Sequence, residues 1–334
     1  MLRALLNLGN GQGRSVLDLA VRRSHEPGVA HLSQALLGDA TGSSVQAVAP
    51  RLVCLVSVAR SGTNYLASLL SRISEVAVRH EIFNKSRCQT MHRDELAEFS
   101  RRSGQNFPLL CDHPEAVSAL RRHPGIAVDC LADFMPPDKA LLFFKVFRLQ
   151  LLVHEVRKAI IERPDTIIVV LRRRPIDTFI SLRKALHQQQ WYGQDTTGLK
   201  ISIDADDFIG WWGRTNAWFH DVEAACWTAN KPLHRLQYED DVNVPAANVI
   251  ARFHEILAQH GMSKLTVLPE GEPSEIRRQD RNSELHDRVA NWSEFAQCLR
   301  DKGFLEKAFA PFPAFEPTTW NRFKARCREV CKRQ

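Results

Sequence analysis

The chain has 334 residues, of which 44% are hydrophobic and 25% charged, and 45 Lys and Arg against 38 Asp and Glu give a formal net charge of +7. This composition excludes a disordered, collagen-like or coiled-coil protein and allows one large α/β domain or two modest ones. The basic surplus suits a phosphorylated nucleotide, an acidic glycan or nucleic acid, although a solvated basic surface would give the same balance.

Residues 1–50 are predicted to form a small helical appendage and a linker. The stretch Ser15–Leu37 has the apolar spacing of two short amphipathic helices, and Glu26, Pro27 and Gly28 interrupt it. Gly38–Pro50 is small and polar, which is typical of a linker. The main domain is therefore expected to span residues 51–334.

The main domain is predicted to be an α/β fold with a parallel sheet flanked by helices. Short apolar runs, rich in β-branched residues, are typical of buried parallel strands. Apolar runs lie at Leu52–Val58, Ala140–Val146 and Thr166–Leu171, and Leu233–Tyr238 is predicted as one more strand. Helical spacing occurs between and after them, at Tyr65–Leu70, Leu149–Glu162, after Pro175, at Phe208–Thr228 and at Pro245–His260. Strand, helix and strand in alternation indicate parallel crossover units.

The first candidate site is the turn between the first strand and its helix, Arg60-Ser61-Gly62-Thr63-Asn64. The N–H groups at a helix start bind anions, glycine allows close approach of the backbone, and arginine adds a forked charged donor. The Walker pattern GxxxxGK[ST] is absent, which weakens an ATP or GTP interpretation. An ordinary capped helix after a strand remains the structural alternative.

A second candidate site follows the third strand, where Arg172, Arg173 and Arg174 precede Pro175 and the next helix, with Ser181 two turns along it. Open α/β sheets bind ligands at the carboxyl ends of their strands. Charged residues at the end of a strand are often only solvated. Here, however, the turn Arg60–Asn64, called the phosphate turn below, is predicted at the end of another strand of the same sheet.

These two segments together resemble the nucleotide-binding motifs of the sulfotransferase superfamily, and bacterial carbohydrate or glycolipid sulfotransferases are the most similar branch. The resemblance implies a P-loop-like fold and the donor 3′-phosphoadenosine 5′-phosphosulfate (PAPS). Residues 236–240 resemble the family's YED segment, and Arg277–Phe295 resembles the C-terminal stretch of the bacterial branch. The donor-binding residues that it implies are Arg60, Ser61, Gly62, Thr63, Asn64, Tyr65, Arg173, Ser181, Arg277 and Arg278.

The catalytic residues implied by the resemblance are Arg60, Lys145 and Glu81. Cytosolic sulfotransferases carry a lysine in the first loop, where Arg60 stands here, and a base histidine where Phe147 stands. The bacterial branch has a loop arginine and a glutamate soon after the first helix, and the segment His80-Glu81 fits that pattern. Glu81 is thus the predicted base, and a surface carboxylate is the alternative.

The sequence also sets expectations for partners and location. No cluster of residues has metal-ligand spacing, so no metal is expected. Eight cysteines without a CxxC pair, a short apolar run at the chain start and no membrane span indicate a cytoplasmic protein. The expected acceptor is a carbohydrate or glycolipid; nucleic acid is not expected, and peripheral membrane association and a homodimer stay open. The rival functions are a P-loop nucleotide kinase or NTPase and an inactive nucleotide-binding module.

Overall fold

The computed structural model describes residues 51–318, except for 192, 194, 264 and 269–279. The chain divides into two units after Ala47, and all that follows concerns the second, Val48–Gln334. The predicted helices of the first fifty residues lie outside the described residues, and so do Arg277 and Arg278.

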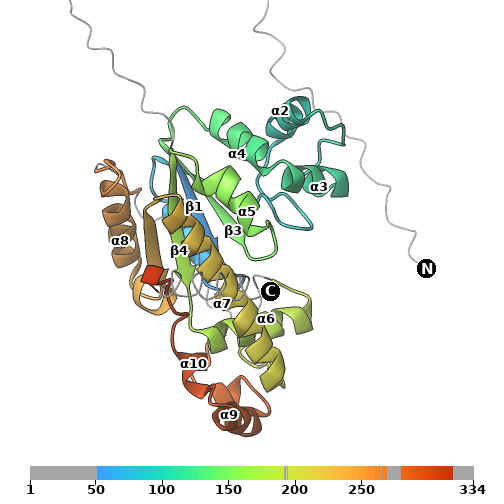
Figure 1. Ribbon diagram of the computed structural model, residues 1–334, viewed down its shortest axis with the longest axis vertical. Helices are drawn as coiled ribbons and strands as arrows, with labels where there is room; N and C mark the ends of the chain where they lie inside the picture. Colours follow the sequence, from blue (N-terminus) through green and yellow to red (C-terminus); the bar gives the residue numbers. More distant parts are fainter. Residues whose placement is uncertain (1–50, 192, 194, 264, 269–279, 319–334) are drawn as a thin grey trace, which may run out of the picture. The chain divides into compact units, whose positions relative to one another are not determined.

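A five-stranded parallel sheet forms the centre of this unit (Figure 1). Its strands are β1 (Arg51–Ser57), β2 (Val76–Val78), β3 (Leu141–Phe147), β4 (Thr166–Arg172) and β5 (Leu233–Gln237), in the order β2-β3-β1-β4-β5. Every residue of β3 and β4 is buried, as expected for strands covered on both faces. The α/β class and the four predicted strands are thereby confirmed.

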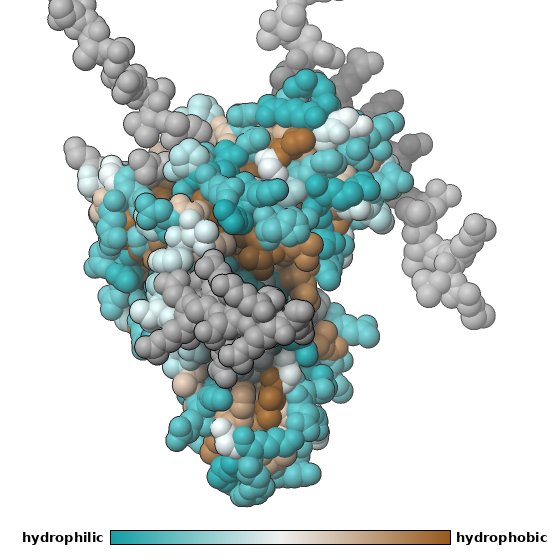
Figure 2. Space-filling view, viewed as in Figure 1, coloured by the Kyte–Doolittle hydropathy of each residue, from teal (hydrophilic) through white to brown (hydrophobic). Residues whose placement is uncertain are grey.

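Helices cover both faces of the sheet. Because side chains alternate along a strand, Val53 and Leu55 of β1 face the core under α1 and α8, whereas Cys54 and Val56 face the core under α4 and α7. On the face drawn in Figure 2 hydrophilic residues predominate. The helices are α1 (Thr63–Leu70), α2 (Arg93–Ser103), α3 (Pro114–Arg122), α4 (Pro124–Asp133), α5 (Val153–Val156), α6 (Pro175–Gln188), α7 (Ala205–Thr228), α8 (Ala246–Ala258), α9 (Trp292–Asp301) and α10 (Leu305–Phe309), with π-helical turns at η1 (Arg157–Ile161) and η2 (Tyr238–Val242) and a 3₁₀ turn at η3 (Leu285–Asp287).

Two predicted helices begin at other residues than expected. The helix predicted from Leu149 begins only at Val153, because Leu149 has a left-handed backbone (φ 75°) that a helix cannot contain. α7 begins three residues before Phe208, since the side chain of Asp204 accepts a hydrogen bond from the backbone N–H of Asp207 (2.8 Å) and caps the helix there.

None of the helices in the described part of the chain combines the length and the apolar character that a membrane span requires.

Candidate active site

The turn between β1 and α1 has the geometry of an anion cradle. Arg60 and Gly62 both adopt left-handed backbone angles (φ 72° and 82°), and Gly62 stands directly before the first residue of α1. A Cβ on Gly62 would lie 2.3 Å from Cε2 of Tyr238, so the site accepts only glycine without rearrangement. The hydroxyl of Ser61 is buried and has no hydrogen-bond partner in the described structure. A bound oxyanion would supply that partner.

Arg173 brings the second predicted motif to this turn. Its guanidinium lies over the ring of Tyr238, 4.5 Å from the centroid, and it donates a hydrogen bond to the carbonyl of Arg60 (2.9 Å). Its Nε is buried without a partner among the described residues. Burial lowers the pKa of Arg173, and the nearby groups of Tyr238 and Asp177 oppose that shift. The guanidinium is therefore a desolvated cation with one donor still to satisfy.

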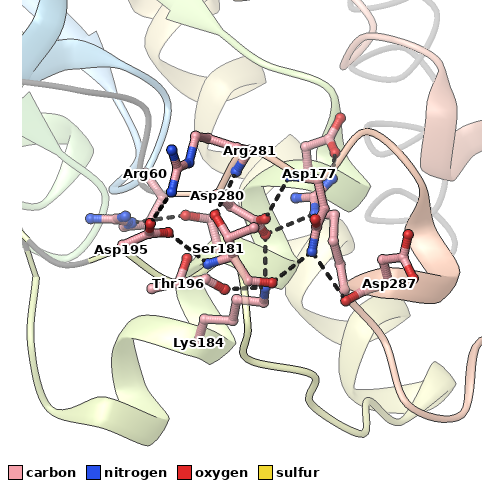
Figure 3. Close-up of polar contacts among 12 residues, drawn as sticks. Arg60, Asp177, Ser181, Lys184, Asp195, Thr196, Asp280, Arg281 and Asp287 are labelled. Carbon is pink, nitrogen blue, oxygen red and sulfur yellow. Dashed lines mark hydrogen bonds and ion pairs between the residues drawn. The ribbon is translucent and has the colours of Figure 1, made fainter.

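The side chain of Arg60 also links the two motifs (Figure 3). Its Nε donates to Oγ of Ser181 on α6 (3.0 Å), and a terminal nitrogen donates to the carbonyl of Trp191. Burial, and secondarily the charge of Arg173, lowers the pKa of Arg60 to about 10. The arginine predicted to face the leaving phosphate thus contacts the serine predicted to bind the 3′-phosphate.

Of the three consecutive arginines at the end of β4, Arg173 alone contacts the phosphate turn. Arg172 is buried and forms an ion pair with Glu223, whose side chain is fully buried. Arg174 forms an ion pair with Asp177 on the first turn of α6. The charges of Arg172 and Arg174 are thus paired with carboxylates of the fold itself.

A buried polar network fastens the segment after residue 279 to α6 (Figure 3). Arg288 pairs with Asp177 and with Asp280 (3.1 Å), and Asp280 also accepts from Lys184 (2.7 Å). Arg288 and Lys184 are only 3% and 1% exposed, so these pairs are shielded from water. The network holds Asp280 and Arg288, whereas Arg277 and Arg278 lie outside the described residues.

Lys145 connects the phosphate turn to the predicted base. It lies in β3 and is fully buried, and its Nζ donates to Oδ1 of Asn64 in α1 (2.5 Å). Burial lowers the pKa of Lys145 to about 8, against the opposing charge of Glu81. The pKa of the neighbouring His80 falls to about 4, through burial and the charge of Lys145. His80 is therefore neutral near pH 7.

Glu81 follows β2, and polar side chains hold its carboxylate. Asn84 Nδ2 (2.9 Å) and Gln150 Nε2 (2.8 Å) both donate to its Oε2. Phe147, at the position where cytosolic sulfotransferases would place a histidine, ends β3 with its ring buried.

A sequence model of the sulfotransferase family matches residues 52–261, which is more than half of the chain. The chain belongs to the sulfotransferase family. No relative is found among curated protein sequences.

Three sulfotransferases are among the solved structures that are similar to this sulfotransferase. One from Alicyclobacillus acidocaldarius is 14% identical, with 81% of this chain and 98% of that chain covered and a TM-score of 0.37. STF1 from Mycobacterium tuberculosis is 13% identical, with 67% and 69% covered and a TM-score of 0.35. Mouse SULT7A1, complexed with PAP, is 11% identical, with 77% and 87% covered and a TM-score of 0.35.

The predicted site residues of this sulfotransferase fall into three groups. The residues of the phosphate turn lie with Arg173, Ser181 and, through Asn64, Lys145. The side chain of Tyr65 instead packs on the apolar core under α1 and α8. Glu81 lies within electrostatic reach of Lys145.

Two residues of the site were not predicted from the sequence. Tyr238 packs on Gly62 and Arg173, and it stands in the segment that resembles the family's YED motif, which could have identified it. Gln150 holds the carboxylate of Glu81, and no motif marked it. Within the described residues no group of three or more His, Cys, Asp and Glu could hold a metal ion.

Proposed function

We propose that this sulfotransferase transfers a sulfuryl group from PAPS to a hydroxyl of a carbohydrate or glycolipid. The observation that supports this donor most directly is that the phosphate turn contacts the segment Arg173–Ser181, which lies far from it in the sequence. Arg173 donates to the carbonyl of Arg60, and the Arg60 side chain donates to Ser181. A ligand with phosphate at both its 3′ and 5′ positions would use both motifs at once.

The unsatisfied polar atoms of the turn fit such a donor. Buried polar groups are almost always hydrogen-bonded, yet Ser61 Oγ and Arg173 Nε have no partner in the described structure. Both are hydrogen-bond donors, and phosphate oxygens are acceptors that satisfy them. The left-handed turn at Gly62 adds backbone N–H groups at the start of α1.

The proposed chemistry is a direct in-line transfer. Glu81 accepts the proton of the acceptor hydroxyl as its oxygen forms a bond to sulfur, and the bond between sulfur and the leaving phosphate oxygen breaks. The negative charge that develops on that phosphate oxygen is stabilised by the N–H groups of the turn, Arg60 and Lys145. Arg60 has to exchange its contact with Ser181 for the donor.

The acceptor class and the cytoplasmic location are proposals of the same kind. A carbohydrate or glycolipid acceptor is supported by the similarity of the His80-Glu81 segment to the bacterial branch. A reducing location is supported by the six described cysteines, which are all free thiols.

The test of the donor is a thermal unfolding titration with adenosine 3′,5′-bisphosphate. At about one hundred times Kd the ligand should raise Tm by roughly 5 °C, and ATP should raise it less. A response to ATP with none to the bisphosphate would contradict the donor and favour an NTPase. A mass-spectrometric search for added sulfate across glycans and glycolipids tests the acceptor. Binding of the bisphosphate with no sulfated product would favour the inactive nucleotide-binding module.

A further inference from the structure

Gln150 lies in the turn after β3 and bridges the end of that strand to Glu81. Its side chain is buried, and the residue is only 5% exposed. The backbone N–H of Phe147 donates to its Oε1 (2.9 Å), and its Nε2 donates to Oε2 of Glu81 (2.8 Å). Because a backbone N–H can only donate, it fixes which end of the amide is the acceptor. The NH₂ group must therefore point at Glu81.

The backbone of Gln150 is held from both sides. Its N–H donates to the carbonyl of Phe147 (3.1 Å), and its own carbonyl accepts from Nε of Arg121 (2.8 Å). The preceding residue, Leu149, is 57% exposed and has a left-handed backbone angle that is costly for a leucine. Strain of this kind persists where the surrounding structure imposes it, often at functional sites. Here it places Gln150 at the carboxylate.

The groups around Glu81 divide into donors and charges. Asn84 donates to the same oxygen as Gln150, but its side chain also accepts bonds from Ser86 in an exposed loop. Lys145 is the cation within electrostatic reach, and the adjacent His80 is neutral near pH 7. Gln150 is the buried, rigid member of this set. A donor fixed in this way holds one carboxylate oxygen in place and thereby orients the second.

We propose that Gln150 is a positioning residue that orients the Glu81 carboxylate for proton abstraction. This inference rests on the proposed role of Glu81 as the base. It assigns Gln150 no contact with the donor, and it predicts that every effect of the residue passes through Glu81.

The decisive variant is Gln150→Glu, which still accepts the Phe147 N–H bond but no longer supplies the amide donor to Glu81. We expect turnover of PAPS to fall about tenfold or more in Gln150→Glu. The acidic limb of the pH–rate profile, which Glu81→Gln should lose, should move to higher pH. Gln297→Glu, at an exposed glutamine of α9, is the matched control and should change neither.

A double-mutant cycle with Gln150→Met separates positioning from a structural role. Turnover of PAPS with an octyl glycoside probe should fall about tenfold or more in the single variant and by less than about threefold in the Glu81→Gln background. Affinity for adenosine 3′,5′-bisphosphate should not change.

Three results would overturn the inference. Equal losses in both backgrounds, or an unchanged acidic limb of the pH–rate profile in Gln150→Glu, refute positioning while the base assignment stands. A Glu81→Gln variant with full turnover refutes the base itself, and the role of Gln150 falls with it.

Discussion

Lys145 is a fully buried charged residue with a proposed catalytic role. Its ammonium lies in a fully buried strand position with Asn64 as its hydrogen-bond partner, and burial lowers its pKa to about 8. A lysine placed there only for stability would be replaced with advantage by an apolar residue. The proposed need for a cation beside the leaving phosphate gives the buried charge a function.

The pKa of Lys145 predicts a pH dependence of stability. The unfolded lysine keeps its proton up to about pH 10.5, whereas the folded one loses it near pH 8. Between these values the unfolded state binds more protons, so the free energy of unfolding should rise with pH. The full shift corresponds to roughly 3 kcal/mol. In Lys145→Met this rise should disappear.

Denaturant titrations of the parent protein and Lys145→Met from pH 7 to pH 10.5 measure this difference. Lys85→Met, at an exposed lysine, is the control and should follow the parent curve. Parallel curves for Lys145→Met and the parent would show that Lys145 does not titrate in this range.

At the scale of elements, the end of β4 directs two neighbouring arginines to opposite faces of the sheet. Successive side chains of a strand point to opposite faces. Arg172 therefore reaches Glu223 in α7 on one face, while Arg173 reaches the phosphate turn on the other. Three consecutive arginines in the sequence thus have different roles in the fold.

Because the two arginines have different partners, substituting one should affect ligand binding and substituting the other should affect stability. Arg173→Ala should weaken binding of adenosine 3′,5′-bisphosphate about ten- to a hundredfold, with a small effect on stability. Arg172→Ala removes a buried partner of Glu223 and should lower the free energy of unfolding by about 3 kcal/mol, while binding stays unchanged. Calorimetric titration and denaturant unfolding measure the two effects. Unchanged affinity in Arg173→Ala would place the 3′-phosphate site elsewhere.

The elements that could be predicted from the sequence are those whose burial is complete. β3 and β4 are continuous apolar runs, which no alternative structure explains as well. β2 was not predicted, because three residues give too little pattern. Neither were α2, α3 and α4, although Pro114 and Pro124 stand at the first positions of two of them, which is a known start signal.

The candidate site, like the fold, could be predicted only in part. The residues proposed to bind phosphate, Arg60 to Thr63, are consecutive in one turn and therefore form a compact motif in the sequence. The contact between Gln150 and Glu81 joins residues 69 positions apart through one amide. Such a contact depends on the left-handed turn at Leu149, and no periodicity or spacing encodes it.

At the scale of the whole molecule, the described residues of the chain form two apolar cores. Their members run from Leu52 in β1 to Phe312 after α10, and they lie on the two faces of the sheet. The phosphate turn and Arg173 follow the carboxyl ends of β1 and β4. Folding of the sheet and formation of the site are therefore expected to be one event.

The last prediction follows from this organisation and concerns residues 1–50. If they are an appendage, a protein that starts at Arg51 should still unfold in one cooperative transition, because it keeps every core residue named above. Adenosine 3′,5′-bisphosphate should raise its Tm by the same amount as in the full chain. Calorimetric scans of both proteins, with and without the ligand, measure this directly. A shortened protein that unfolds without cooperativity would show that the first fifty residues complete the fold; one that folds but gives no shift would show that they complete the donor site.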